Sequence, residues 1–162
     1  MIIIGYQGIG KSSLARTANN VIDLESGCFW NGNYRHGDWY VYYCNVAIDL
    51  SSQGNTVFVS SHRDVRNQFA RLPKNELIVV CYPTLELKDE WTEKLKVRYE
   101  RSGLSKDQKA WTRAALCYES DITDLMNSPF DKIEIKSMFY DLHQLIRDWQ
   151  EEFIYEETHH DV

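Results

Sequence analysis

Prolines, closely paired cysteines, long apolar runs and an excess of basic charge are scarce or absent in this sequence of 162 residues. Its 3 prolines form no proline-rich linker, and its 4 cysteines lack the close spacing of a redox motif or a zinc site, which favours buried free thiols.

The 18 lysines and arginines against 24 aspartates and glutamates give a net charge of −6. That balance argues against a broad electrostatic surface for nucleic acid. The apolar opening Ile2–Ile4 is far shorter than a signal-peptide core or a membrane span. We therefore expect a cytoplasmic protein without stable nucleic-acid or membrane binding.

The composition present is that of a globular protein, with 43% hydrophobic and 13% aromatic residues. A chain of this length buries enough surface to fold without a disulfide or a structural metal. No internal repeat and no low-complexity segment divides it. We predict a single domain over residues 1–162. No zipper or other self-association pattern is found, so the sequence is compatible with a monomer or a homodimer.

Short apolar runs alternate with helical patterns, which is typical of α/β proteins built on a mostly parallel sheet. Five strands are expected, at residues 1–4, 21–24, 56–59, 77–82 and 133–135. Apolar residues at helical spacing predict helices that include residues 12–18, 39–50, 65–72, 87–101, 105–127 and 142–153. A capping box formed by Ser105 and Gln108 is expected to begin the fifth of these helices.

The strongest motif lies directly after the first strand and directly before the first helix. Residues 5–12 read GYQGIGKS and match the phosphate-binding pattern G-x-x-x-x-G-K-[ST] in full. In this pattern glycines let the backbone turn tightly, so that N–H groups and the start of the helix face phosphate oxygens. We expect Lys11 to contact the β- and γ-phosphates of ATP and Ser12 to bind Mg²⁺. The other donor-binding residues are expected from the same loop: Gly5, Gln7, Gly8, Ile9, Gly10 and Ser13.

A basic helix narrows the class of nucleotide-binding protein. The chain offers little room for the extra domains of motors or helicases and lacks the NKxD motif of guanine specificity, which favours a small kinase. Lys94, Arg98 and Arg101 fall within roughly 60° of one another on a helix. They share that face with the apolar Leu87 and Trp91. Cations beside a buried face indicate an anion in a cleft, as in a lid that closes over phosphates. Alternatively, their stems only pass Trp91 on the way to solvent.

With these features the sequence resembles the nucleoside monophosphate kinases of the P-loop class, in particular the small phage-type deoxynucleoside monophosphate kinases, over most of its length. Besides GYQGIGKSS, the similar stretches are VIDLES at 21–26, GNTVFVSSHRDVR at 54–66, CYP at 81–83 and LKDEWTEKLKVRYERSG at 87–103. The resemblance implies a three-layer P-loop fold with a five-stranded parallel sheet of order 2-3-1-4-5, helices on both faces and a helical lid. It implies ATP and Mg²⁺ as the donor and a nucleoside monophosphate as the acceptor.

The resemblance also suggests roles for particular residues. Arg63 occupies the place of an arginine that holds the acceptor's α-phosphate, and Arg98 and Arg101 occupy the place of lid arginines on the transferring phosphoryl group. The lid would span residues 88–113 and an acceptor-binding loop residues 28–40. The expected catalytic residues are Lys11, Lys94, Arg98 and Arg101. The expected acceptor-binding residues are Asp23, Glu25, Arg35, Trp39, His62, Arg63 and Arg66.

Several of these assignments have alternatives. Arg35 is a candidate for a phosphate and Trp39 for stacking on a nucleobase, but Trp39 also fits the core stripe of its helix. His62 either contacts the acceptor or caps a helix.

The metal shell departs from the family pattern, because the third strand ends in Val59, Ser60 and Ser61 without an acidic residue. Asp23 or Glu25, after the second strand, is the replacement we expect, and we assign the metal to Ser12 and Asp23. Glu25 also keeps a second chemistry open, in which a carboxylate acts as base on a hydroxyl acceptor. A third possibility is a nucleotide-binding interaction protein that transfers nothing.

Overall fold

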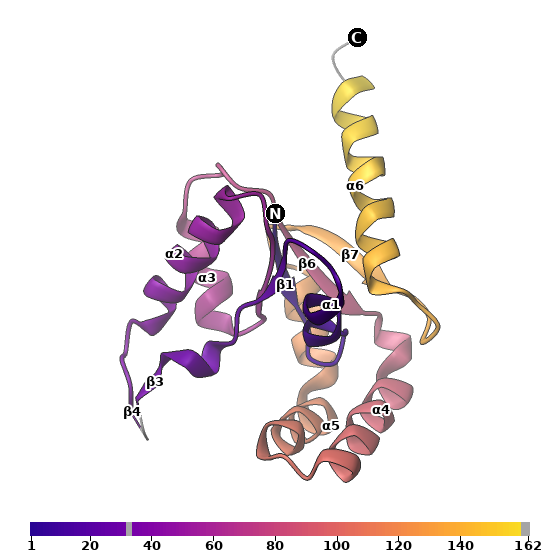
Figure 1. The fold of residues 1–162 in the computed structure, drawn as a ribbon. Coiled ribbons are helices and arrows are strands. Elements are labelled where there is room, and N and C mark those ends of the chain that lie inside the picture. The colour runs from indigo at the N-terminus through magenta and orange to yellow at the C-terminus, as the bar shows by residue number, and fades with distance from the viewer. Residues whose placement is uncertain (32–33, 160–162) are drawn as a thin grey trace.

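A five-stranded sheet forms the centre of the computed structural model, which describes residues 1–31 and 34–159 (Figure 1). The strands lie in the order β2-β5-β1-β6-β7, and every neighbouring pair is parallel. Their bounds are β1 Ile2–Gly5, β2 Val21–Asp23, β5 Thr56–Ser60, β6 Ile78–Pro83 and β7 Asp131–Ile135. The predicted parallel sheet and its order 2-3-1-4-5 are therefore confirmed.

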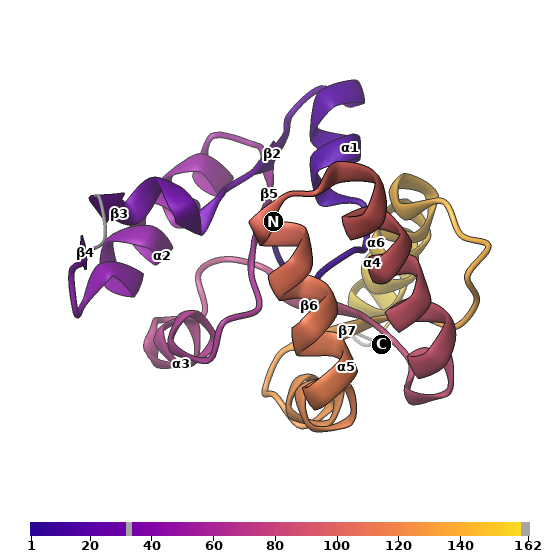
Figure 2. The same cartoon turned by 90° about the horizontal axis from the view of Figure 1, so that it is seen from below.

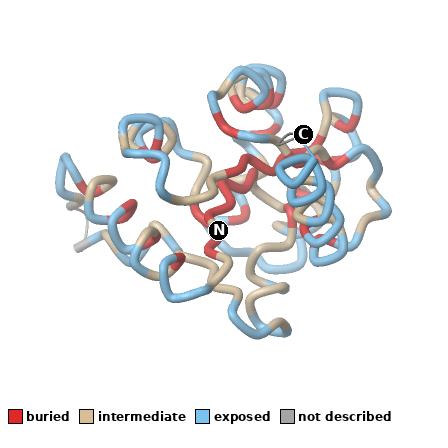
Figure 3. Tube along the Cα trace, turned by 90° about the horizontal axis from the view of Figure 1, so that it is seen from above, coloured by how far each residue is buried: buried red, intermediate tan, exposed pale blue. Residues whose placement is uncertain are grey.

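Helices surround the sheet in a three-layer α/β arrangement (Figures 1 and 2). They are α1 Lys11–Thr17, α2 Trp39–Ser52, α3 Arg63–Arg71, α4 Lys88–Ser102, α5 Ser105–Met126 and α6 Leu142–His159, with short 3-10 helices η1 Ser26–Phe29 and η2 Leu85–Leu87. Right-handed crossovers between parallel strands direct α1 to one face and α2, α3 and α5 to the other. Because β1 is the central strand, it is covered on both faces, and Ile2, Ile3 and Ile4 are all 0% exposed (Figure 3).

Three features differ from the sequence expectations. A small antiparallel hairpin, β3 Trp30–Asn31 with β4 Tyr34–Arg35, lies in the expected acceptor-binding loop, of which residues 32 and 33 are outside the described residues. The C-terminal helix continues past the apolar pattern to His159 and extends away from the sheet (Figure 1). Of the cysteines, Cys44 and Cys81 are buried as expected, but Cys28 is exposed and Cys117 is half-buried.

The predicted capping box at the start of α5 is wrong. The chain reverses direction between α4 and α5 within Gly103 and Leu104, so the extended Leu104 becomes the N-cap and Ser105 is already helical. Ser102 takes over the polar role at this turn, because its hydroxyl accepts a hydrogen bond from the Leu104 N–H and donates one to the Asp107 carboxylate. The reversal places α4 and α5 side by side (Figures 1 and 2).

No described helix is both long enough and apolar enough to cross a membrane.

Candidate functional site

The loop between β1 and α1 has a backbone that only glycine adopts easily at two positions. Gly8 and Gly10 have φ values of 85° and 105°. A Cβ atom on Gly8 would also lie 2.8 Å from the Leu95 side chain. Gly10 is the N-cap of α1, and no side chain caps this helix end. The first N–H groups of α1 therefore have no intrahelical partner and remain available to a ligand.

Lys11 and Ser12 lie at the start of α1 beside the end of β2. The Lys11 amine donates a hydrogen bond to the Gly5 carbonyl over 3.1 Å. Burial lowers the pKa of Lys11, and the nearby carboxylates of Asp23 and Glu25 oppose that shift. The Ser12 hydroxyl donates to the Asp23 carboxylate over 2.7 Å. The structure thus brings a hydroxyl and a carboxylate together next to a buried amine.

A cleft of about 760 Å³ opens above this loop, at the carboxyl edge of the sheet. It brings together ten of the predicted site residues: Gln7, Gly8, Gly10, Lys11, Ser12, Ser13, Asp23, Glu25, Lys94 and Arg98. Its lining holds seven basic side chains, Lys11, Arg16, Lys94, Arg98, Lys106, Lys109 and Arg113, and three acidic ones, Asp23, Glu25 and Asp107. We call it the loop cleft. A local excess of positive charge in a chain of net charge −6 favours a polyanionic ligand here.

A second hollow of about 380 Å³ lies between α3 and α5. Of the predicted residues it contains Gln7, His62, Arg63 and Arg66, and it adds Tyr6, Ser60, Ser61, Arg113, Asp121, Asp124 and Leu125. We call it the arginine hollow. It shares Gln7, Ser60 and Arg113 with the loop cleft, so the two cavities have a common wall. The carboxyl ends of β1 and β5 meet at this wall.

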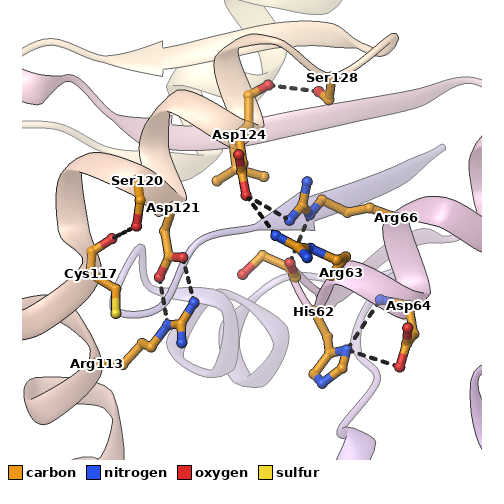
Figure 4. Close-up of polar contacts among 12 residues, drawn as sticks. His62, Arg63, Asp64, Arg66, Arg113, Cys117, Ser120, Asp121, Asp124 and Ser128 are labelled. Carbon is orange, nitrogen blue, oxygen red and sulfur yellow. Dashed lines mark hydrogen bonds and ion pairs between the residues drawn. The ribbon is translucent and has the colours of Figure 1, made fainter.

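Each arginine of the hollow is directed by an aspartate or a carbonyl (Figure 4). Two nitrogens of Arg113 bind the two carboxylate oxygens of Asp121 at 2.8 and 2.6 Å, which raises the pKa of Arg113. Arg66 donates from Nε to the Ser61 carbonyl over 3.0 Å, and its side chain is only 15% exposed. Asp124 lies between Arg63 and Arg66, at 3.7 and 3.8 Å from their guanidinium nitrogens. Held in this way, the three arginine side chains all line the same hollow.

His62 takes one of the two roles that the sequence offered as alternatives, the helix cap. Its Nδ1 accepts a hydrogen bond from the Asp64 N–H over 3.2 Å, which makes it the N-cap of α3. The side chain also lines the arginine hollow.

The structure does not bring Arg35, Trp39 or Arg101 to either cavity. Trp39 is 6% exposed, because its ring packs edge-on against the Tyr43 ring at 5.5 Å and is covered by the Arg35 guanidinium at 3.3 Å from the ring centroid. Trp39 therefore belongs to the core. Arg35 is held there by a hydrogen bond to the Ser26 carbonyl over 3.1 Å. Arg101 is exposed in the last turn of α4.

Gly5 and Ile9 of the loop are buried, and Ile9 packs its side chain in the core. The Gly5 carbonyl accepts the Lys11 amine, and the Ile9 carbonyl accepts the Tyr140 hydroxyl.

Sequence reasoning missed the polar face of α5 that lines the arginine hollow and carries Arg113, Asp121 and Asp124. At 100° per residue these three positions fall within about 80° of one another on a helix, so their spacing could have revealed a shared polar face. Which partners that face would meet depends on α3, which lies far away in the sequence.

No protein-family model and no curated protein matches the chain. The functional assignment therefore depends on the geometry of the site. Within the described residues, no group of three or more His, Cys, Asp or Glu side chains could hold a metal ion. Mg²⁺ needs no such group, because it retains waters and binds substrate phosphates together with one or two protein oxygens. The Ser12 hydroxyl and the Asp23 carboxylate, which share a hydrogen bond, suit that kind of site.

Proposed function

We propose that this protein is a P-loop kinase that transfers the γ-phosphoryl group of ATP to a nucleoside monophosphate. The observation that carries the proposal is the wall shared by the loop cleft and the arginine hollow. Gln7, Ser60 and Arg113 border both cavities, so phosphates bound in the two would lie next to each other. Phosphoryl transfer requires this adjacency, because its catalysis consists mainly of positioning and charge stabilisation.

The loop cleft would bind the donor. Its volume and its seven basic side chains suit a nucleoside triphosphate. Lys11 would leave the Gly5 carbonyl, its present partner at 3.1 Å, for the β- and γ-phosphates. Ser12 and Asp23 would hold Mg²⁺, which offsets the charge on the transferring group.

The arginine hollow would bind the phosphate of the acceptor. Arg63, Arg66 and Arg113 come from two helices and line this hollow. Arg63 and Arg66 lie beside Asp124, and Arg113 lies beside Asp121 (Figure 4). In the structure Asp121 and Asp124 partner these arginines. An incoming phosphate dianion would compete with the two carboxylates for the same guanidinium donors.

Arg98 and Arg101 would act from the α4–α5 hairpin. Arg98 already lines the loop cleft and forms an ion pair with Asp107 at 2.8 Å. Arg101 lies outside the cleft, so a contact with the transferring group would require the tip of the hairpin to close.

The direct test is ADP formation from Mg-ATP with each ribo- and deoxyribonucleoside monophosphate, and with nucleosides as a second panel. We expect acceptor-dependent ADP formation with at least one monophosphate, and its loss in Lys11→Ala. Arg66→Ala should raise the KM for the acceptor at least tenfold and leave the KM for ATP unchanged. Arg71→Ala, on the exposed last turn of the same helix, is the matched control and should change neither. ATP binding without turnover for any monophosphate would contradict the proposal.

A hydroxyl acceptor is the second candidate, and it rests on Glu25. This carboxylate is exposed and lines the loop cleft, where it could accept a proton from a hydroxyl nucleophile. A monophosphate acceptor is already an anion and needs no base. Under the second candidate Glu25→Gln abolishes turnover without changing ATP affinity, whereas a monophosphate kinase retains most of its turnover.

A further inference from the structure

Three successive carbonyl groups of the β1–α1 loop are bound by side chains from distant parts of the chain. The Gln7 carbonyl accepts the indole N–H of Trp91 over 2.9 Å. The Gly8 carbonyl accepts the Lys94 amine over 2.8 Å, and the Ile9 carbonyl accepts the Tyr140 hydroxyl over 2.8 Å. Trp91 and Lys94 lie on α4, and Tyr140 lies between β7 and α6. Each of these three consecutive carbonyls is thus held by one side chain.

The same three side chains contact one another, and we call them the carbonyl clamp. The rings of Trp91 and Tyr140 stack at a centroid distance of 6.0 Å and an angle of 19°. The Lys94 amine lies 4.1 Å from the Trp91 ring centroid and donates a second hydrogen bond to the Tyr140 hydroxyl over 3.2 Å. Trp91 is 0% exposed, and burial lowers the pKa of Lys94, with Arg98 adding to the shift. The clamp is therefore a packed unit and not a set of surface contacts.

Peptide geometry links the clamp to the opposite side of the loop. In a planar trans peptide the C=O of one residue and the N–H of the next point in opposite directions. Fixing the carbonyls of Gln7, Gly8 and Ile9 toward the clamp therefore turns the N–H groups of Gly8, Ile9 and Gly10 away from it. Two of these residues are glycines, whose backbone is otherwise free to take other conformations.

We infer that Trp91, Lys94 and Tyr140 are positioning residues that fix the N–H groups of the β1–α1 loop in the orientation that binds phosphate. Lys94, which the sequence predicts to be a catalytic cation, acts in this view through the loop backbone, because its amine is bound to the Gly8 carbonyl and the Tyr140 hydroxyl. A loop ordered before the ligand arrives loses less conformational entropy on binding. The inference rests only on the phosphate site of the proposed function and on no statement about the acceptor.

The test compares two tyrosines that make the same bond in different places. The hydroxyl of Tyr118 on α5 donates to the Thr84 carbonyl over 2.8 Å, the same distance as between Tyr140 and Ile9, and touches no loop residue through that bond. Tyr140→Phe and Tyr118→Phe each remove one such hydroxyl. Binding of ADP and of inorganic tripolyphosphate is measured by calorimetry, and the melting temperature of each variant is recorded. Tripolyphosphate carries no base or sugar, so it reports on the loop alone.

We expect Tyr140→Phe to weaken the binding of both probes about five- to tenfold, which corresponds to one hydrogen bond. Tyr118→Phe should lower the melting temperature by about as much as Tyr140→Phe does. It should change the binding of either probe by less than twofold. A purely structural role for Tyr140 predicts equal binding by the two variants, and that result overturns the inference. Loss of ADP binding with unchanged tripolyphosphate binding also overturns it, since Tyr140 would then act on the base or sugar.

A double-mutant cycle tests whether the clamp acts as one unit. Lys94→Met keeps most of the side-chain length and removes the charge and the donor. If Lys94 and Tyr140 act together, the double variant loses less tripolyphosphate affinity than the product of the two single losses. If the affinity loss of the double variant equals the product of the two single losses, the two residues act independently, which contradicts the clamp. Should the wild-type protein bind neither probe, the phosphate site of the proposed function fails together with this inference. Wild-type binding that Tyr140→Phe leaves intact overturns the inference alone.

Discussion

Replacement of Tyr43 by phenylalanine probes the hydrogen bonds that join the ends of β2 and β5. The Tyr43 hydroxyl donates to the Leu24 carbonyl over 2.6 Å and accepts the Ser60 N–H over 2.8 Å. The residue is 0% exposed. Leu24 lines the loop cleft, and Ser60 lines both cavities. A single buried hydroxyl therefore fixes the edge of the sheet at which we place phosphoryl transfer.

The magnitude follows from the two bonds. Each typically contributes about 1 kcal/mol, and an unpaired buried carbonyl or N–H costs about 1–3 kcal/mol. We expect Tyr43→Phe to lower the free energy of unfolding by about 2–4 kcal/mol. Urea denaturation should show a lower midpoint with an unchanged m-value. Because Ser60 is released, acceptor-dependent turnover should also fall about tenfold.

Tyr42→Phe on the same helix is the matched control, because Tyr42 is 56% exposed and its stability should change by less than about 0.5 kcal/mol. A loss of less than about 1 kcal/mol in Tyr43→Phe would refute the reasoning. So would a change no larger than that of the Tyr42 control.

Three further predictions test the β1–α1 loop and the proposed Mg²⁺ site. Burial lowers the pKa of Lys11 in the folded protein. Between that lowered pKa and the ordinary value of 10.5, the unfolded state therefore binds more protons than the folded state. The free energy of unfolding should rise with pH over this range. Lys11→Met should lack this rise and be more stable at pH 7; equal pH profiles in urea denaturation would contradict the assignment. Asp23→Asn should raise the Mg²⁺ concentration for half-maximal turnover about tenfold, and an unchanged Mg²⁺ titration would remove Asp23 from the metal site. Gly8 has a positive φ, and a Cβ atom added there would lie 2.8 Å from the Leu95 side chain, so Gly8→Ala should abolish ADP binding. The control is Gly54→Ala, at φ 89° with open space around it. It should lower the free energy of unfolding by about 1 kcal/mol and leave ADP binding intact. ADP binding that survives in Gly8→Ala would contradict the role of the loop.

The strands and most helices were predictable because their signals are local. Strands buried on both faces are continuous apolar runs, and the predicted 77–82 corresponds closely to β6 Ile78–Pro83. The β1–α1 loop was recognised for the same reason, since its glycines, lysine and serine are contiguous. The hairpin β3–β4 was missed because strands of two residues carry no periodicity. The capping box at Ser105 was wrong because the length of the α4–α5 turn, and not the residue pair, decides where the helix begins.

The partners of the site residues could not be predicted in this way. Trp39 has the aromatic character expected for base stacking, but the core stripe of α2 and the Arg35 guanidinium cover it. Lys94 has the charge expected of a lid cation, but its amine is bound to a loop carbonyl 86 residues away in the sequence.

The alternation of strands and helices and the position of the glycine-rich loop can be read locally, because both depend on neighbouring residues and on short periods of hydrophobicity. Which side chains meet depends on the packed fold. The pairing of Tyr140 with Ile9 spans 131 residues, and the arginine hollow joins α3 to α5 across the carboxyl edge of the sheet. Such contacts are set by the order of the strands and the packing of the helices on them, which no local pattern encodes.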